Sequence, residues 1–177
     1  MFSGSFFQFG GAFMEQQEEL ETQRELDRID RRILDALQGD ARLTMAELAE
    51  RVSLSPSPCW RRVQILEKAG VIVGYHARLD RRRIGLGVHG FVYVRMQEHT
   101  TRSAASFEAQ VVALNGIVAC QNLSGHYDYQ LELVATDHDT FARLVREKVC
   151  ALPGVRDIHT SLSLREVKAA GMLPVEI

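Results

Sequence analysis

One stretch of sequence decides the fold of the N-terminal half of this chain, namely Ser55-Pro56-Ser57-Pro58-Cys59-Trp60-Arg61-Arg62-Val63-Gln64-Ile65-Leu66-Glu67-Lys68-Ala69-Gly70. A Ser-Pro pair favours a helix start, because Ser57 can accept hydrogen bonds from unpaired amides and Pro58 at the first helical position has no N–H to lose. Gly70 is typical of the residue that follows a helix. The stretch therefore predicts a helix that begins at Pro58 and ends before Gly70.

The two sides of this helix differ in chemistry. At about 100° per residue, one side carries the apolar residues Cys59, Val63 and Leu66. The other side carries hydrogen-bond donors, a guanidinium and the only tryptophan of the chain, namely Trp60, Arg61, Gln64 and Lys68. Such a face suits a polar, anionic surface, and DNA is the obvious candidate. A charged outer face is also typical of a helix that meets only solvent, so the neighbouring segments must decide.

Two further short helices precede this one. From Asp27 to Gly39 the apolar positions follow the 3.6-residue period, namely Ile29, Ile33, Leu34 and Leu37. Thr44 can cap a second helix, and Glu47 three residues later completes a capping box. Three short helices with a tight turn at 53–55 are the helix-turn-helix pattern, in which the third helix enters the major groove by its N-terminal end.

The uneven charge of the chain supports this interpretation. The net charge of −2 conceals a basic segment, because residues 27–83 hold 12 Lys and Arg against 8 Asp and Glu. We therefore predict that the partner is double-stranded DNA. The predicted DNA-binding residues are Ser55, Ser57, Trp60, Arg61, Gln64 and Lys68. Arg62 lies nearer the apolar side, and we expect it to pair with an acidic residue of the first helix.

Composition also divides the chain into domains. Residues 1–24, with a Phe- and Gly-rich start, are expected to be a mobile extension outside the fold. The helix-turn-helix domain is predicted over 25–72, followed by a hinge strand and linker over 73–87 and a second domain over 88–177. The linker contains Arg81-Arg82-Arg83. This run could contact phosphates or simply join the domains, and the joint is the interpretation we adopt.

The second half resembles two βαβ units in series. Strand patterns over 88–96 and 127–134 each precede an amphipathic helix, and strand patterns over 117–123 and 158–164 follow the helices. The first helix carries Phe107 and Val111 on one face, and Asp137 or Asp139 can cap the second. The order βαββαβ predicts a ferredoxin-like domain with four antiparallel strands. The chain is thus predicted to be α+β, with an N-terminal three-helix, winged helix-turn-helix domain.

Helices that cover one face of such a sheet leave its other face bare. Phe91, Tyr93 and Leu131 are the candidates for an apolar face that two subunits bury against each other, which predicts a homodimer. A two-fold axis would also hold two DNA-binding domains for half-sites one helical turn apart.

Other classes of protein find little support in the sequence. The three cysteines, Cys59, Cys120 and Cys150, are odd in number and far apart, which favours a reducing cytoplasm over a disulfide framework. No apolar run approaches the ~20 residues of a membrane span. We predict no catalytic residue, metal or cofactor, because the chain lacks a nucleophile–base pair, a Gly-rich phosphate loop and a Cys/His cluster. The alternatives are a metabolite-binding oligomeric sensor without its own DNA target and a ferredoxin-like enzyme.

Several pieces together resemble the feast/famine regulators of the Lrp/AsnC family, over roughly residues 25–170. They are Leu26-Asp27-Arg28-Ile29-Asp30-Arg31-Arg32-Ile33-Leu34, Leu54-Ser55-Pro56-Ser57-Pro58-Cys59-Trp60-Arg61-Arg62-Val63, Leu66-Glu67-Lys68-Ala69-Gly70-Val71-Ile72 and Ser124-Gly125-His126-Tyr127-Asp128-Tyr129. The resemblance implies a transcription regulator whose C-terminal domain binds a small effector, typically an amino acid. It also implies dimers that assemble further, commonly into octamers.

The resemblance places an effector pocket at one turn of the second domain. The matching residues here are Leu123, Ser124, Gly125, His126, Tyr127 and Asp128. Asp128 could hold an amino group, and backbone amides around Gly125 could receive a carboxylate. The alternative is a plain hairpin turn, in which Gly supplies backbone freedom and Asp accepts local amides.

Overall fold

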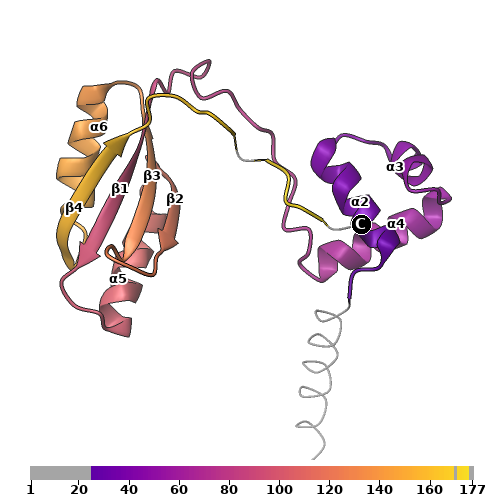
Figure 1. The fold of residues 1–177 in the computed structure, drawn as a ribbon, viewed down its shortest axis with the longest axis horizontal. Helices are drawn as coiled ribbons and strands as arrows, with labels where there is room; N and C mark the ends of the chain where they lie inside the picture. Colours follow the sequence, from indigo (N-terminus) through magenta and orange to yellow (C-terminus); the bar gives the residue numbers. More distant parts are fainter. Residues whose placement is uncertain (1–24, 170, 176–177) are drawn as a thin grey trace, which may run out of the picture. The chain divides into compact units, whose positions relative to one another are not determined.

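The computed structural model describes residues 25–169 and 171–175, and these fall into two compact units. The head unit is the described part of Met1–Ala77 together with the described part of Lys168–Ile177, and the sensor unit is Arg78–Val167. The predicted mobile extension, residues 1–24, lies outside the described residues. Each unit has its own buried apolar cluster, so each is described by itself (Figure 1).

The head unit consists of three short helices, α2 (Arg28–Gly39), α3 (Met45–Arg51) and α4 (Pro56–Lys68). The predicted capping box of α3 is confirmed, because the Thr44 amide donates to Glu47 at 2.8 Å and the Glu47 amide donates to the Thr44 hydroxyl at 3.3 Å. Each helix turns its apolar side inward. The side chains buried between them are Ile33, Leu48, Ala49, Val52, Cys59, Val63 and Leu66.

Helix α4 begins two residues earlier than predicted. Its N-cap is Ser55, whose side chain makes no capping hydrogen bond, and Pro56 is the first helical residue. The prediction of Ser57 as cap and Pro58 as first residue is therefore wrong. Both prolines fit inside the first turn, whose amides have no partner within a helix, so the earlier Ser-Pro pair is free to open it. The predicted end is confirmed, because Ala69 caps the helix and Gly70 has φ +68°.

The strand expected within residues 73–87 is not formed in the described chain. Residues 73–80 form neither a helix nor a strand, and a turn follows in which the Leu86 amide donates to the Arg81 carbonyl at 2.8 Å. A strand needs a neighbour to pair with its amides and carbonyls, and none of the described segments of this chain supplies one. The segment is therefore an extended connection that ends in a turn.

The sensor unit confirms the predicted ferredoxin-like βαββαβ order. Its elements are β1 (Val88–Met96), α5 (Thr101–Val112), β2 (Ile117–Asn122), β3 (Tyr129–Ala135), α6 (His138–Leu144) with a π-helical continuation η1 (Val145–Val149), and β4 (Val155–Leu162). The four strands are antiparallel in the order β2-β3-β1-β4 (Figure 1). Asp137 caps α6, as one of the two predicted alternatives.

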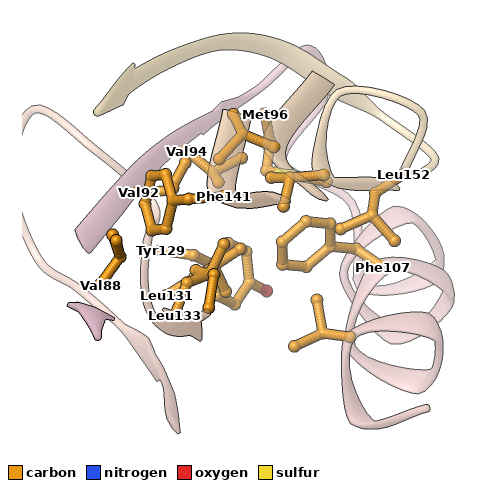
Figure 2. Packing of buried hydrophobic residues seen from close by; sticks show 14 residues of the cluster. Val88, Val92, Val94, Met96, Phe107, Tyr129, Leu131, Leu133, Phe141 and Leu152 are labelled. Carbon is orange, nitrogen blue, oxygen red and sulfur yellow. The ribbon is translucent and has the colours of Figure 1, made fainter. Parts of the chain in front are cut away.

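Strict alternation along β1 and β3 separates a covered face of the sheet from an open one. In Figure 2 the alternate side chains of these strands, among them Val92, Val94 and Leu133, pack with Phe107 of α5 and Phe141 of α6. Leu131 belongs to this covered face and is 0% exposed, so its predicted place on the open face is wrong. The β3 residues on the open face are Gln130, Glu132 and Val134. Phe91 and Tyr93 of β1 do lie on the open face.

Candidate nucleic-acid interface and effector turn

The six residues predicted to contact DNA form one exposed surface along α4, called here the reading surface. Its members are Ser55, Ser57, Trp60, Arg61, Gln64 and Lys68, and all six are exposed. Trp60 keeps 55% of its surface accessible, although it is an aromatic residue in a helix whose other side is buried. A large apolar side chain held in solvent beside a guanidinium suits contacts to sugars, base edges and phosphates.

A shallow hollow adjoins the N-terminal end of α4. Met45, from the start of α3, lines it together with Pro56, Ser57, Trp60 and Arg61. Neither Met45 nor Pro56 was among the residues predicted to contact DNA. The N-terminus of α4 also carries the partial positive charge of the helix dipole, which favours an anion at this end.

Glu67 organises the opposite end of the reading surface. Its carboxylate accepts hydrogen bonds from the Gln64 amide at 2.8 Å and from the Tyr75 hydroxyl at 2.9 Å. Partial burial, together with the bond to Glu67 and its charge, raises the pKa of Tyr75 to about 12. Neither Glu67 nor Tyr75 was predicted to take part. The negative charge of Glu67 near Gln64 makes this end less suited to phosphate than the end that holds Arg61.

Arg62 braces α4 against the start of α2, as predicted. Its guanidinium lies 2.6 Å from the Asp27 carboxylate and 2.7 Å from the Asp30 carboxylate. These two hydrogen bonds raise the pKa of Arg62. Partial burial acts to raise the pKa of Asp27, but the amides of Asp30 and Ile29 and the Arg62 guanidinium together lower it. The brace fixes the rotation of α4, so it decides which side chains form the reading surface.

The predicted effector residues form the turn 123–128 between β2 and β3, called here the effector turn. The Leu123 amide donates to the Asp128 carbonyl at 2.8 Å, and the Asp128 amide donates to the Val94 carbonyl at 2.9 Å. Gly125 has φ +137°, a conformation that side-chain-bearing residues rarely adopt. Ser124, Gly125 and His126 are exposed at the tip, whereas Leu123, Tyr127 and Asp128 are half-buried at its base.

The Asp128 carboxylate connects the effector turn to the end of β1. One oxygen accepts the Met96 amide at 2.7 Å, and the other lies 3.2 Å from Nδ1 of His99. The bond to Met96 ties the turn to β1, whereas the Asp of a plain hairpin turn would accept amides of the turn itself. The second oxygen faces the exposed imidazole of His99 and is the position from which a ligand ammonium could be held. Sequence reasoning missed His99, which is distant from the turn in sequence.

Aromatic side chains link the effector turn to the open face of the sheet. The ring of Tyr127 lies 5.5 Å from that of Tyr93 and 6.2 Å from that of His159, measured between centroids. His126 packs edge-on against Tyr127 at 4.7 Å. The turn is therefore in contact with the face on which a second subunit was predicted to pack.

Comparison with known proteins identifies both units. Residues 26–73 match the model of a winged helix-turn-helix DNA-binding domain. Residues 89–173 match the Lrp/AsnC ligand-binding domain. The leucine-responsive regulatory protein of Salmonella typhimurium is 37% identical over 153 residues, which cover 86% of this chain and 93% of that protein. This chain belongs to the Lrp/AsnC family of transcriptional regulators. The predicted family, fold class and regulatory function are thereby confirmed.

Other transcriptional regulators are similar to this chain in sequence and in structure. The DNA-binding transcriptional activator DecR of Escherichia coli is 33% identical over 151 residues, covering 85% of this chain and 99% of DecR. A transcriptional regulator of Neisseria meningitidis, solved in complex with L-methionine, superposes with a TM-score of 0.81 at 37% identity and covers 86% of this chain and 98% of its own. An AsnC-family regulator of Agrobacterium tumefaciens superposes with a TM-score of 0.79 at 33% identity, covering 85% and 97%.

Two searches of the described residues gave negative results. No group of three or more His, Cys, Asp or Glu side chains in this part of the chain is placed to hold a metal ion. None of the described helices is both long and apolar enough to cross a membrane.

Proposed function

We propose that this Lrp/AsnC regulator binds operator DNA through the reading surface of α4 and that an amino acid modulates its DNA binding or its assembly. One observation carries the DNA part: all six reading-surface residues are exposed on α4 or at its N-cap, and Arg62 of the same helix is bonded to Asp27 and Asp30. The amino-acid part is supported by the leucine-responsive relatives and by the relative solved with L-methionine.

In the proposed complex, the N-terminal end of α4 enters the major groove. Arg61 pairs with a guanine or a phosphate, and Ser55 and Ser57 donate to phosphates. Trp60 packs its ring against sugars or a thymine methyl group. Gln64 reads a base edge only if its hydrogen bond to Glu67 exchanges for one to the base, and Lys68 adds a phosphate contact at the far end. The positive end of the helix dipole strengthens the contacts at Ser55 and Ser57.

The proposed effector site is the effector turn, completed by groups around it. Backbone amides near Gly125 receive the carboxylate of the amino acid, and Asp128 holds its ammonium group. His99 is the competing partner for the Asp128 oxygen, because its Nδ1 lies 3.2 Å from that oxygen. Ligand binding therefore replaces the contact of Asp128 with His99 by a contact with the ligand ammonium, so the local effect of the effector is to release His99.

The assembly proposed is a homodimer that forms through the open face and associates further, up to an octamer. Phe91 and Tyr93 provide apolar surface on that face. A two-fold axis then presents two heads to half-sites one helical turn apart. The proposed domains are a DNA-binding domain over 25–72, a connection over 73–87 and an effector-binding and oligomerisation domain from residue 88 onward. Three free thiols support a cytoplasmic location.

The reading surface is tested by fluorescence anisotropy with DNA from upstream of the protein's own gene, over a range of salt concentrations. Arg61→Ala is expected to weaken binding by about tenfold and to lower the salt dependence by about one counterion. Arg156→Ala, which removes an exposed arginine of β4, is the matched control and is expected to bind like the parent. Undiminished binding by Arg61→Ala would exclude this reading surface.

The effector site is tested by calorimetric titration of the parent and of Asp128→Ala with the common amino acids. At least one amino acid is expected to bind the parent saturably and to bind Asp128→Ala about tenfold more weakly or not at all. Asp139→Ala, at an exposed position in the first turn of α6, is the control. Equal affinity for the parent and Asp128→Ala would remove Asp128 from the site.

A further inference from the structure

We infer that residues 171–175 form a strap, which docks in an apolar groove of the head and couples the sensor unit to the head by a second connection besides the linker. The docking itself is independent of any ligand. The coupling role rests on the proposed function, because it concerns how the effector changes DNA binding.

The strap is attached to the head at a defined residue. The Leu173 amide donates to Oε1 of Gln38 at 2.7 Å, and Nε2 of Gln38 donates to the Leu173 carbonyl at 3.1 Å. One side-chain amide thus satisfies both backbone groups of a single residue, as a neighbouring strand would do. Two bonds to one residue fix the register of the strap against the last turn of α2.

An apolar groove lies beside this attachment, and it is lined both by residues of the helical part of the head and by residues of the strap. The residues that line it include Leu34 and Leu37 of α2, Val71 after α4, and Leu173, Pro174 and Val175 of the strap, and its volume is about 530 Å³. Leu34 and Leu37 are only partly buried against the head's own core. The strap therefore partners an apolar stripe of α2 that the three-helix core leaves uncovered.

The linker and the strap leave the sensor sheet at the same end. Gly90 near the start of β1 is paired with Leu162 at the end of β4, and the Ser163 amide donates to the His89 carbonyl at 2.8 Å. Farther along, Arg78 of the linker lies 4.0 Å from Glu166 of the segment that leads to the strap. Two strands that are paired in the sheet thus continue into the two connections that reach the head unit.

The strap is held loosely enough to be released. Leu173, the residue with both hydrogen bonds, keeps 75% of its surface exposed. A segment with few buried contacts opens locally at low free energy, so a modest change in the sensor can shift its docked population. Docking restricts the orientations of the head because two connections constrain it more than one does. An effector that alters β1 or β4 would then change the freedom of the reading surface.

The docking is tested by hydrogen exchange on the full-length parent, without DNA or amino acid. Gln38→Ala and a chain that ends at Val167 are both expected to exchange faster than the parent over Leu34 to Gln38 in α2. Gln110→Ala, which removes an exposed glutamine amide of α5, is the control and is expected to leave α2 unchanged. Equal exchange of α2 in the parent and in both variants would overturn the docking. Two variants are used so that a folding defect in one of them does not decide the result.

The coupling is tested with the same three proteins, using DNA affinity with and without an amino acid that binds the parent. Both strap variants are expected to keep the parent's affinity for the amino acid within about twofold and to bind DNA as the undocked parent does. The effector-dependent change in DNA affinity is expected to fall by about fivefold or more. Full coupling in both variants would overturn the role of the strap. A parent that binds neither DNA nor an amino acid would instead contradict the proposed function and leave the exchange result standing.

Discussion

The guanidinium of Arg62 donates a hydrogen bond of 2.7 Å to Asp30, whose side chain is only 2% exposed. Arg62→Ala would remove the guanidinium bonded to this buried carboxylate, so we expect a loss of about 3 kcal/mol in the free energy of unfolding of the head. Urea denaturation monitored by Trp60 fluorescence measures it. Arg61→Ala, one position earlier and exposed, is expected to change stability by less than about 0.5 kcal/mol. Equal stability of the Arg62→Ala variant and the parent would contradict the brace.

The same brace predicts a pH dependence through Asp27. The pKa of Asp27 is below its usual value near 3.8, so its charged form is favoured in the folded state. Its contribution to stability is therefore present above about pH 4 and is lost as the pH falls through the lowered pKa. Asp27→Asn keeps a capping side chain but cannot titrate. We expect its stability to fall less steeply below pH 4 than that of the parent, and parallel acid curves would refute the assignment.

Tyr129, in the core of the sensor unit, predicts a second pH dependence of stability, at alkaline pH. The Tyr129 hydroxyl donates to Glu108 at 2.8 Å, and burial together with the bond to Glu108 raises the pKa of Tyr129 from 10.0 to about 12. The neutral hydroxyl therefore contributes stability below pH 10 that disappears between pH 10 and about 12. Tyr129→Phe is expected to cost about 1 kcal/mol at neutral pH. Its melting temperature should then fall less than the parent's from pH 9 upward, and an identical fall would count against the pair.

Trp60 makes the reading surface observable without a label. It is the only tryptophan of the chain and is 55% exposed. Burial against DNA is expected to quench its emission or shift it to shorter wavelength, in step with the anisotropy of labelled DNA. Trp60→Phe should abolish the signal. An unchanged emission spectrum at saturating DNA would place Trp60 outside the interface.

Leu131 and Phe91 separate the two faces of the sheet. Leu131→Ala opens a cavity on the covered face and is expected to lower the free energy of unfolding by about 3 kcal/mol.

Phe91→Ala removes apolar surface from the open face, so we expect it to raise the dimer dissociation constant while the sensor unit stays folded. Sedimentation at several concentrations measures the second effect. A Phe91→Ala protein that assembles like the parent would move the dimer interface elsewhere.

Local chemistry explains which predictions were confirmed. Thr44 and Glu47 are three residues apart, so their capping box follows from the sequence. The position of Arg62 around the helix, near its apolar side, was enough to predict its pairing with an acidic residue of the first helix. Ser55 and Ser57 each precede a proline and satisfy the same rule, so only the folded chain distinguishes them. The face of Leu131 depends on its register opposite Val92, which pairs residues far apart in sequence.

The contacts that sequence reasoning missed are also long-range. Asp128 meets Met96 across 32 positions, and Gln38 meets Leu173 across 135. Neither pair has a spacing that a helix or strand period would reveal, because each depends on how separate elements pack. The family resemblance was therefore needed to single out the effector turn, and it pointed to no role for the end of the chain.

The attachment of Leu173 to Gln38 makes the head a discontinuous module, assembled from the two extremities of the described polypeptide. Anyone who grafts this head onto a foreign sensor would have to transfer residues 25–77 and 168–175 together. A fragment cut after Ala77 would expose the apolar stripe of α2 and invite aggregation. A circular permutation that joins the two extremities and opens the chain within the linker would instead encode the whole head as one continuous segment.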